Sequence, residues 1–226
     1  MSSMQLGVVI QARMRSQRLF GKVLMPIGNR PLLGHVTGRL HLLSNPVQVI
    51  VATSLQAADA VIARWCEDSG IACFRGSELD VLDRYYECAR HYGFNTVVRL
   101  TADNPFTDIE ELDRLIELHL ADRNDYTHSF GALPIGVGAE IFGFAALERS
   151  HRDGHEPRYR EHVNEYMIEN QELFRTGILA VPAAKHCPDL RLTVDTEEDY
   201  RRACFVAEHA RGTWVTTEEA IELCAR

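Results

Sequence analysis

A loop near the start of the chain gathers enough positive charge to bind a polyphosphate. Residues 13–22 read Arg-Met-Arg-Ser-Gln-Arg-Leu-Phe-Gly-Lys, which places four cations within ten positions. Such closely spaced charges repel one another unless an anion lies between them. Guanidinium groups bind phosphate oxygens in pairs and an ammonium acts as a point charge, so the loop predicts a triphosphate ligand. A solvated basic loop is the alternative interpretation.

This basic loop follows neither of the two common glycine-rich phosphate-binding patterns. It lacks the G-x-x-x-x-G-K-[ST] of a P-loop and the G-x-G-x-x-G of a dinucleotide-binding turn. Its charged side chains lie outside the apolar segments, so we expect them to contribute little to folding.

Two aspartates at the ends of apolar segments form a second candidate site. Asp103 ends the segment R-L-T-A-D, and Asp195 ends the segment R-L-T-V-D. If both segments are central parallel strands, both carboxylates emerge at the sheet edge that holds the basic loop. Mg²⁺ is typically held by one or two carboxylates together with substrate phosphates, so the pair predicts a magnesium site. The structural alternative is that Asp103 opens an Asp-Asn-Pro turn and Asp195 caps a helix.

Strand and helix patterns alternate along most of the chain and place these residues. Short apolar, β-branched runs predict strands at 6–12, 47–53, 71–74, 96–101, 177–181 and 190–194. Amphipathic runs predict helices at 32–43, 57–68, 81–91, 109–120, 144–151, 160–170, 197–211 and 217–224. This alternation indicates one α/β domain over 1–226, with three layers and helices on both faces of a mostly parallel sheet.

The segment from about 131 to 170 breaks the alternation, and we interpret it as an insertion. It is rich in glycine and carries a run of apolar residues at Leu133, Ile135, Val137, Ile141 and Phe142. An isolated apolar hairpin is not stable in water, so we expect this segment to form a two-fold homodimer. The alternative is that the segment folds back onto its own domain and leaves a monomer.

Composition excludes several classes of function. The chain has 226 residues and a net charge of −8, which argues against a nucleic-acid partner because such surfaces need a basic stripe. No apolar run approaches the ~20 residues of a membrane span, and the first residues lack a secretory pattern. Six scattered cysteines without zinc-site spacing predict reduced thiols. We therefore expect a cytoplasmic protein without a membrane partner.

Three motifs in consistent order resemble one family of enzymes. The segment V-I-Q-A-R-M-R-S-Q-R-L-F-G-K-V-L is similar to the opening of the cytidylyltransferases that activate acylneuraminate and 3-deoxy-manno-octulosonate sugars, and most similar to their SpsF-type spore-coat polysaccharide branch. F-R-G-S-E-L-D-V-L-D-R-Y resembles a second motif of that branch, and L-T-A-D-N-P with D-T-E-E-D resembles the family's metal-binding motifs. Phe20 stands where the family usually has proline, which leaves the rigidity of the loop open but removes no charged contact.

The resemblance implies roles for individual residues. It implies a Rossmann-like nucleotide-diphospho-sugar transferase fold and catalysis by loop cations that hold the CTP phosphates, namely Arg13, Arg18 and Lys22. The implied nucleotide-binding residues are Ala12, Arg13, Ser16, Arg18, Lys22, Arg75, Gly76 and Asp80. Mg²⁺ is expected on Asp103 and Asp195. The implied acceptor-binding residues are Glu140, Arg160 and His162, for which an exposed helix face is the alternative at the last two. The resemblance also implies that the segment from about 131 to 170 helps to close the acceptor pocket.

These residues together predict a Mg²⁺-dependent cytidylyltransferase. It would transfer CMP from CTP to a hydroxyl of a sugar or sugar acid and release pyrophosphate, in surface polysaccharide or glycoconjugate biosynthesis. A glycosyltransferase or another nucleotidylyltransferase on the same sheet is one alternative, since fold does not fix the reaction. A non-catalytic nucleotide-binding protein is the other.

Overall fold

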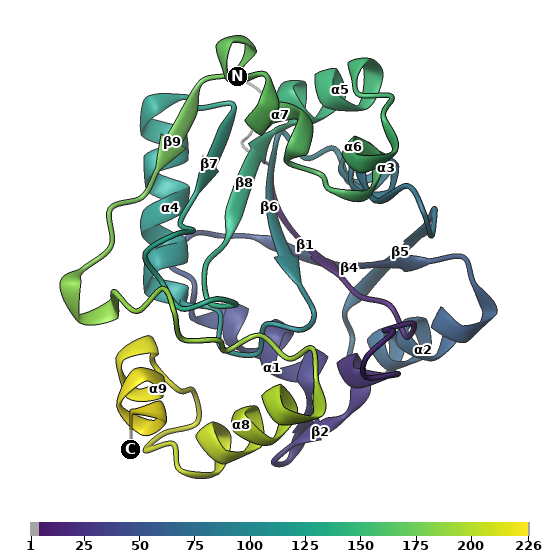
Figure 1. Ribbon diagram of the computed structural model, residues 1–226. Helices are drawn as coiled ribbons and strands as arrows, with labels where there is room; N and C mark the ends of the chain where they lie inside the picture. The colour runs from purple at the N-terminus through teal and green to yellow at the C-terminus, as the bar shows by residue number, and fades with distance from the viewer. Residues whose placement is uncertain (1–4, 226) are drawn as a thin grey trace.

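A seven-stranded sheet runs through the middle of the protein (Figure 1). The structure is a computed structural model and describes residues 5–225. In spatial order the strands are β5 (Ala72–Gly76), β4 (Gln48–Ser54), β1 (Leu6–Gln11), β6 (Thr96–Thr101), β8 (Glu140–Gly143), β7 (Tyr126–His128) and β9 (Thr176–Ile178). β1, β4, β5 and β6 pair in parallel, whereas β8 runs antiparallel to both of its neighbours. The predicted mostly parallel α/β sheet is confirmed.

Helices cover both faces of this sheet, which gives the three predicted layers (Figure 1). The helices are α1 (Leu32–Arg39), α2 (Ala60–Asp68), α3 (Val81–Tyr92), α4 (Ile109–Asp122), α5 (Phe144–Asp153), α6 (Pro157–Glu161), α7 (Glu165–Glu169), α8 (Glu197–Glu208) and α9 (Thr217–Cys224). Short 3₁₀ turns lie at Lys22–Leu24, Leu40–Leu42, Ala57–Asp59, Gln171–Leu173 and Ala183–Lys185, and a small hairpin pairs β2 (Pro26–Ile27) with β3 (Arg30–Pro31).

Alternation along the central strand assigns its side chains to two cores. Val8 and Ile10 of β1 pack into the core that contains apolar residues of α1, α2, α4, α8 and α9. Val9, between them, packs into the core formed with α3 and α5. All three side chains are fully buried, as expected for a parallel strand covered on both faces. Within residues 5–225, no helix combines the length and apolar character needed to cross a membrane.

Two expectations about the second half of the chain are wrong. The strand expected at 190–194 does not join the sheet and makes only an isolated parallel bridge between Arg191 and Ile135. The single helix expected at 160–170 is divided into α6 and α7. Short buried runs do not distinguish a sheet strand from an extended segment laid over a loop, because both bury alternate side chains.

The segment 131–170 is also not a separate hairpin. Its strand β8 lies inside the sheet between β6 and β7, and Leu133, Val137, Ile141 and Phe142 are buried within the one chain. The alternative that the segment folds back onto its own domain is therefore the observed arrangement. These apolar residues need no second subunit, and the homodimer stays a prediction.

The loop before β8 packs tightly against the extended segment at 190–194. The amide of Ile135 donates to Leu190 O at 2.8 Å, and the amide of Leu192 donates to Ile135 O at 2.8 Å. Gly136 has a φ of 97°, and a Cβ added there would lie 2.5 Å from the amide nitrogen of Thr193. Only glycine permits this approach, which fixes the position of the chain that leads to Asp195.

We expect Gly136→Ala to destabilise the protein by roughly 2 to 4 kcal/mol, because the new methyl group meets backbone and the backbone angle is strained. Gly131→Ala is the matched control, since Gly131 has a similar φ of 94° but no atom within 4 Å of the added Cβ. Urea unfolding measures both changes. Equal losses of stability in the two variants would show that the close packing at Gly136 does not matter.

Candidate active site

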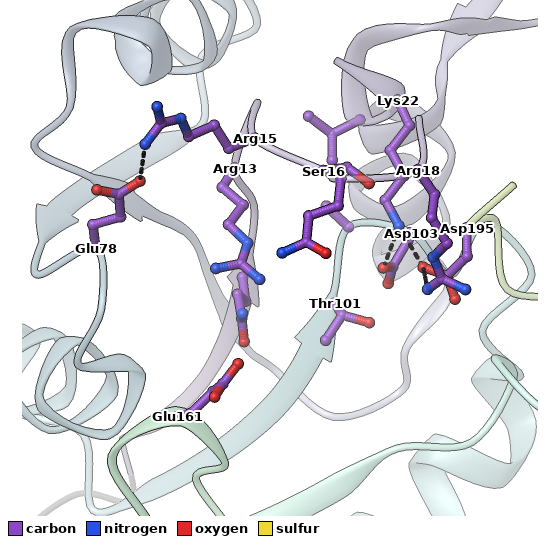
Figure 2. A pocket seen from close by; sticks show the side chains of 14 residues that line it. Arg13, Arg15, Ser16, Arg18, Lys22, Glu78, Thr101, Asp103, Glu161 and Asp195 are labelled. Atoms are coloured by element: carbon purple, nitrogen blue, oxygen red, sulfur yellow. Dashed lines mark hydrogen bonds and ion pairs between the residues drawn. The ribbon is translucent and has the colours of Figure 1, made fainter. Parts of the chain in front are cut away.

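A cavity of about 720 Å³ lies beyond the carboxyl ends of β1 and β6 (Figure 2). Most of its walls come from the basic loop and from the turn after β6, and single residues come from the segments around 78, 161 and 195. The lining residues are Gln11, Arg13, Arg15, Ser16, Gln17, Arg18, Lys22, Val23, Glu78, Thr101, Ala102, Asp103, Glu161 and Asp195. The structure thus brings together the predicted loop cations and both predicted aspartates.

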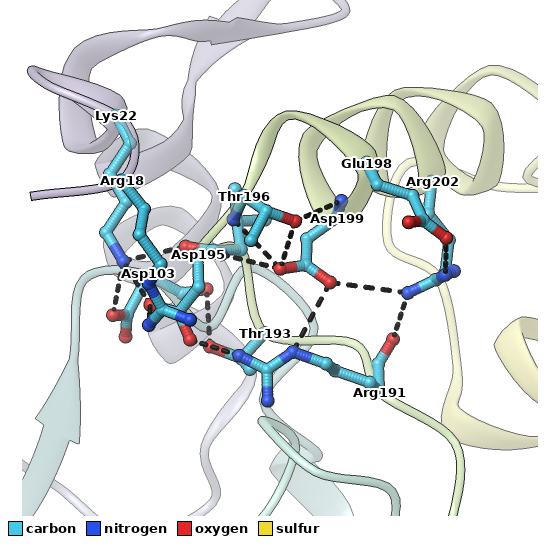
Figure 3. A network of polar contacts seen from close by, with 11 residues as sticks. Arg18, Lys22, Asp103, Arg191, Thr193, Asp195, Thr196, Glu198, Asp199 and Arg202 are labelled. Carbon is cyan, nitrogen blue, oxygen red and sulfur yellow. Dashed lines mark hydrogen bonds and ion pairs between the residues drawn. The ribbon is translucent and has the colours of Figure 1, made fainter.

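The Lys22 ammonium group lies at one side of this cavity and links the basic loop to the segments that carry Asp103 and Asp195 (Figure 3). Nζ donates to Asp103 Oδ2 at 2.8 Å, to Asp195 Oδ1 at 2.8 Å and to the carbonyl oxygen of Val194 at 2.7 Å. An ammonium group has three protons to donate, so all of its hydrogen-bonding capacity is used. The two carboxylates therefore share one cation.

Asp195 has two further cationic neighbours. Arg18 contacts Oδ1 at 3.1 Å, and Arg191 forms an ion pair with Oδ2. Burial raises the pKa of the Asp195 carboxyl, but the hydrogen bond and charge of Lys22, with the charges of Arg18 and Arg191, outweigh it and hold the pKa below its ordinary value. Asp195 is therefore an anion at neutral pH.

The alternative that Asp195 caps the following helix is wrong, because Thr196 caps that helix. The Thr196 hydroxyl accepts from the Asp199 amide at 3.2 Å, and Asp199 Oδ2 accepts from the Thr196 amide at 2.9 Å (Figure 3). This reciprocal capping box satisfies the start of α8 without the Asp195 side chain. The carboxylate of Asp195 is left to face Lys22.

The burial of Lys22 contradicts the expectation that the loop cations contribute little to folding. It is only 6% exposed, and it begins a 3₁₀ turn directly after Gly21, whose φ is 71°. The amide of Gly21 donates to Met14 O at 2.9 Å, which closes the loop and turns Lys22 inward. A buried ammonium with two carboxylate partners is part of the fold as well as of the cavity.

The other loop cations remain at the cavity surface. The Arg18 side chain is 61% exposed, and Arg15 contacts Glu78 at 3.6 Å on another side of the cavity (Figure 2). Arg13 lines the cavity and forms no ion pair with any residue in 5–225. Ser16 lies beside them, whereas Phe20 is exposed and outside the lining. Arg13 is thus available to an anionic ligand, and Arg18 could reach one by releasing its exposed contact with Asp195.

Four predicted nucleotide residues do not line this cavity. Arg75 donates to Ser54 O at 3.0 Å and to Gln56 O at 2.9 Å, so its side chain is held by the backbone. Gly76 ends β5, and Asp80 caps α3 by accepting from the Asp83 amide at 2.8 Å. Asp80 therefore has a structural role at the start of α3. Ala12 is buried beneath the loop rather than exposed in the cavity.

The three predicted acceptor residues also lie outside the cavity lining. Glu140 is buried, forms an ion pair with Arg99 and accepts from the Tyr126 hydroxyl at 2.7 Å. Arg160 donates to Asp80 at 2.7 Å and to His151 O at 2.8 Å. His162 is exposed. Glu140 and Arg160 are occupied by contacts within the fold, and an acceptor role for the three residues stays a prediction.

Several cavity residues were missed by sequence reasoning. Gln11 and Thr101 are paired across β1 and β6, directly before the loop and before Asp103. This position at the ends of two neighbouring parallel strands is a signal that could have found them. Glu78 and Glu161 reach the cavity from α-helical and loop segments far along the chain, and no local pattern marks them.

The carboxylate pair fits a divalent cation by geometry and chemistry. Both Asp103 and Asp195 place an oxygen 2.8 Å from the Lys22 nitrogen, so a positive charge is already accommodated between them. Carboxylate oxygens are the ligands that Mg²⁺ prefers. Among residues 5–225, the one group of three or more potential ligands is Asp108, Glu110 and Glu111, and the ammonium of Lys185 contacts all three at 2.7 to 3.3 Å. That group is therefore a structural ion-pair cluster.

Comparisons with known proteins identify the family of this chain. A family model described as Cytidylyltransferase matches residues 7–223. The spore coat polysaccharide biosynthesis protein SpsF of Bacillus subtilis is 37% identical over 197 residues, which are 85% of this chain and 82% of that protein. A cytidylyltransferase structure from Leptospira borgpetersenii has a TM-score of 0.91 and 31% identity, covering 98% of this chain and 94% of that one.

A more distant structure shares the fold. It is a CMP:2-keto-3-deoxy-manno-octonic acid synthetase complexed with CTP, with a TM-score of 0.67 and 16% identity, covering 88% of this chain and 97% of that one. The level of identity limits this comparison to architecture.

We expect Lys22→Met to lower the free energy of unfolding by roughly 2 kcal/mol, because two carboxylates lose the cation between them. The partial exposure of both carboxylates keeps this loss below that of a fully buried pair. Arg18→Ala is the control, and we expect it to stay within about 0.5 kcal/mol of the wild type because its side chain is exposed. Urea unfolding at low salt measures both. A Lys22→Met protein as stable as the wild type would contradict the assigned role of the ammonium.

Proposed function

We propose a reaction for this chain from one premise, namely that it belongs to the cytidylyltransferase family and is a nucleotidyltransferase enzyme. The proposed reaction transfers CMP from CTP to a hydroxyl of a sugar or sugar acid and releases pyrophosphate. A role in making a surface polysaccharide or glycoconjugate precursor is supported by the similarity to SpsF. CTP as the nucleotide is supported by the family and by a protein of the same fold that binds CTP.

One observation carries the proposal: Lys22 lies between Asp103 and Asp195 at the edge of a cavity that also holds Arg13 and Arg18. The arrangement offers cations for the phosphate oxygens and carboxylates for a divalent metal ion. Both are needed when charge builds up on a departing pyrophosphate. The absence of a glycine-rich P-loop is compatible with this scheme, because side chains rather than backbone amides supply the positive charge.

The loop cations bind and orient the triphosphate. Arg13 and Arg18 lie at the cavity surface and hold phosphate oxygens through their guanidinium groups. As the acceptor hydroxyl attacks the α-phosphorus in line, the bond to the β-phosphate breaks and negative charge moves onto pyrophosphate. Cations that are already in place stabilise this charge without the cost of reorganising water.

Lys22 takes part by exchanging partners. All three of its protons are engaged in the free protein, so a contact with phosphate requires it to release at least one carboxylate. Asp103 and Asp195 would then hold Mg²⁺, which supplies positive charge to the phosphate oxygens. The negative charge on the two aspartates is balanced before and after the exchange.

Two further expectations remain predictions, a cytoplasmic location and a homodimer. Of the apolar residues that suggested a dimer, Ile135 is the exposed one, so a two-fold interface would have to form around it. The glycosyltransferase and non-catalytic alternatives are not favoured, because the chain belongs to a family of nucleotidyltransferase enzymes.

We expect Asp103→Asn and Asp195→Asn each to lower kcat/KM for CTP by roughly 100-fold or more, because the amide loses the charge that holds Mg²⁺. Pyrophosphate release measured against Mg²⁺ concentration should show a weaker metal dependence in each variant. Asp68→Asn, on the exposed surface of α2, is the control and should retain full activity. Full activity in both site variants would place the metal elsewhere.

The reaction itself is tested by incubating the protein with CTP, Mg²⁺ and a panel of sugars and sugar acids. We expect mass spectrometry to detect a CMP-sugar together with pyrophosphate in equal amounts. Release of a free nucleoside diphosphate would instead indicate a glycosyltransferase. Tight nucleotide binding without turnover on any acceptor would indicate a non-catalytic protein.

A further inference from the structure

The carboxylate of Asp59 is buried against the backbone of the basic loop, and the proposed reaction does not use it. Asp59 is 3% exposed and lies outside the lining of the cavity. Its Oδ1 accepts from the Met14 amide at 2.7 Å, although the two residues are 45 positions apart, and the Ser54 hydroxyl donates to its Oδ2. Burying a carboxylate costs free energy unless its oxygens accept hydrogen bonds. Both contacts are therefore needed to keep Asp59 in this place.

Helix capping does not explain this carboxylate. Asp59 directly precedes α2, where an aspartate commonly accepts a hydrogen bond from an amide of the first helical turn. Within the described part of the chain, its side chain makes no such bond to α2 and is directed to Met14 instead. The positive end of the helix dipole still stabilises a carboxylate at this position. The start of α2 thus holds the charge, while the orientation of the side chain serves the basic loop.

Met14 is the residue through which this contact acts on the loop. Asp59 holds its amide, the Gly21 amide donates to its carbonyl oxygen at 2.9 Å, and its side chain packs against the larger hydrophobic core. A residue that is held by its amide, its carbonyl and its side chain has little conformational freedom left. Arg13 and Arg15 flank Met14 and both line the cavity (Figure 2). The fixed backbone of Met14 therefore sets the direction in which both arginines leave the chain.

Arg13 depends most on this backbone. Its guanidinium group forms no ion pair with any residue in 5–225, so no acidic partner fixes its position. The bond from Gly21 to Met14 also lies directly before the 3₁₀ turn that begins with Lys22. A shift of the Met14 backbone would therefore displace cations on both sides of the loop. Cations contribute most to phosphate chemistry when they are in place before the ligand binds.

The carboxylate of Asp59 is itself held by the turn between β4 and α2. The Ser54 hydroxyl, which donates to Asp59, accepts from the Gln56 amide at 3.1 Å, and the Asp59 amide donates to Gln56 O at 3.0 Å. Arg75 closes the turn from the neighbouring strand by donating to Ser54 O at 3.0 Å and to Gln56 O at 2.9 Å. The hydrogen-bond acceptor for Met14 is thus fixed on a rigid support beside β1.

We propose that Asp59 is a positioning residue for triphosphate binding, which fixes the Met14 peptide and thereby aims Arg13 and Arg15 into the cavity. The inference rests on the proposed function, because it takes the basic loop to bind phosphate. Its geometric effect is opposite in sign to the effect of its charge. A carboxylate near the phosphates repels them, so any gain in affinity from Asp59 must come from the placement of the loop.

Two substitutions separate geometry from charge. Asp59→Ala removes the acceptor of the Met14 amide, and we expect the Kd of CTP and of inorganic tripolyphosphate to rise about tenfold. Asp59→Asn removes the charge but keeps a carbonyl oxygen for Met14, while its amide nitrogen can donate to the Ser54 hydroxyl. We expect its Kd values to stay within about threefold of those of the wild type. Calorimetric titration with Mg²⁺ and without an acceptor measures all of them.

The opposite results would overturn the proposal. Unchanged or tighter binding by Asp59→Ala would show that the carboxylate acts only through its charge or not at all. Equal weakening in both variants would show that the hydrogen bond to Met14 does not matter. Ser54→Ala is a second variant in case Asp59→Ala folds poorly, because it frees Oδ2. We expect it to raise both Kd values about threefold, and unchanged values would count against the proposal.

A general loss of stability is controlled by Val206→Ala. Val206 is fully buried on α8 and lies outside the cavity lining, so its truncation destabilises the core without reaching the loop. We expect its Kd values for CTP and tripolyphosphate to stay within about twofold of those of the wild type. Weakening as large as in Asp59→Ala would assign the effect to stability and overturn the positioning role.

The loop can also be followed without nucleotide, through the methyl groups of the five methionines. Met14→Leu assigns the Met14 signal in a ¹³C-methyl spectrum. We expect this signal to shift or broaden in Asp59→Ala and to stay near its wild-type position in Asp59→Asn. The signal of Met167, buried on α7, should not move in either variant. A Met14 signal that is unchanged in Asp59→Ala would contradict the proposed contact.

Failure of the proposed function gives a different pattern. If the wild type binds neither CTP nor tripolyphosphate, the proposed function is wrong and the positioning role falls with it. If the wild type binds both and Asp59→Ala binds them equally well, the positioning role alone is overturned. Weaker binding in Asp59→Ala with recovery in Asp59→Asn supports both.

Discussion

The shared cation between Asp103 and Asp195 is the interaction on which the site depends. Two carboxylates this close repel each other, and the ammonium of Lys22 removes that repulsion while all three of its protons are satisfied. Because the ammonium is buried, the partners cannot be lost without a cost in stability. In the proposed reaction, the substrate and its metal ion would replace this charge, and binding would proceed by exchange of partners.

The fold places these charges at one edge by simple means. β1 and β6 are parallel neighbours in register, so the basic loop and Asp103 leave the sheet side by side. Asp195 reaches the same edge by a different route, through an extended segment whose Val194 amide donates to Asp103 O at 2.8 Å. The close approach of Gly136 to Thr193 fixes the position of that segment. The loop before β8 thus supports the carboxylate pair.

The sequence predicted the parallel core and the main charges of the site well, for identifiable physical reasons. The strand β6 has the β-branched, mostly buried pattern Thr-Val-Val-Arg-Leu-Thr, and Asp103 follows two residues after its end. It predicted long-range pairing poorly. Arg160 holds Asp80 across 80 residues, and β8 inserts into the sheet although its neighbours suggested a hairpin. No local pattern specifies such partners, and the burial of Lys22 likewise depends on carboxylates that lie far from it in the chain.

The exchange of partners by Lys22 can be observed directly, because Lys22 and Lys185 are the only lysines in the sequence. Selective ¹⁵N labelling of lysine should yield two side-chain ammonium signals, which Lys22→Met assigns. On saturation with CTP and Mg²⁺, we expect the Lys22 signal to shift as Nζ moves from a carboxylate to phosphate. The Lys185 signal, held by its own acidic cluster, should remain in place. A Lys22 signal that stays unchanged while nucleotide is bound would contradict the exchange and, with it, the assigned site.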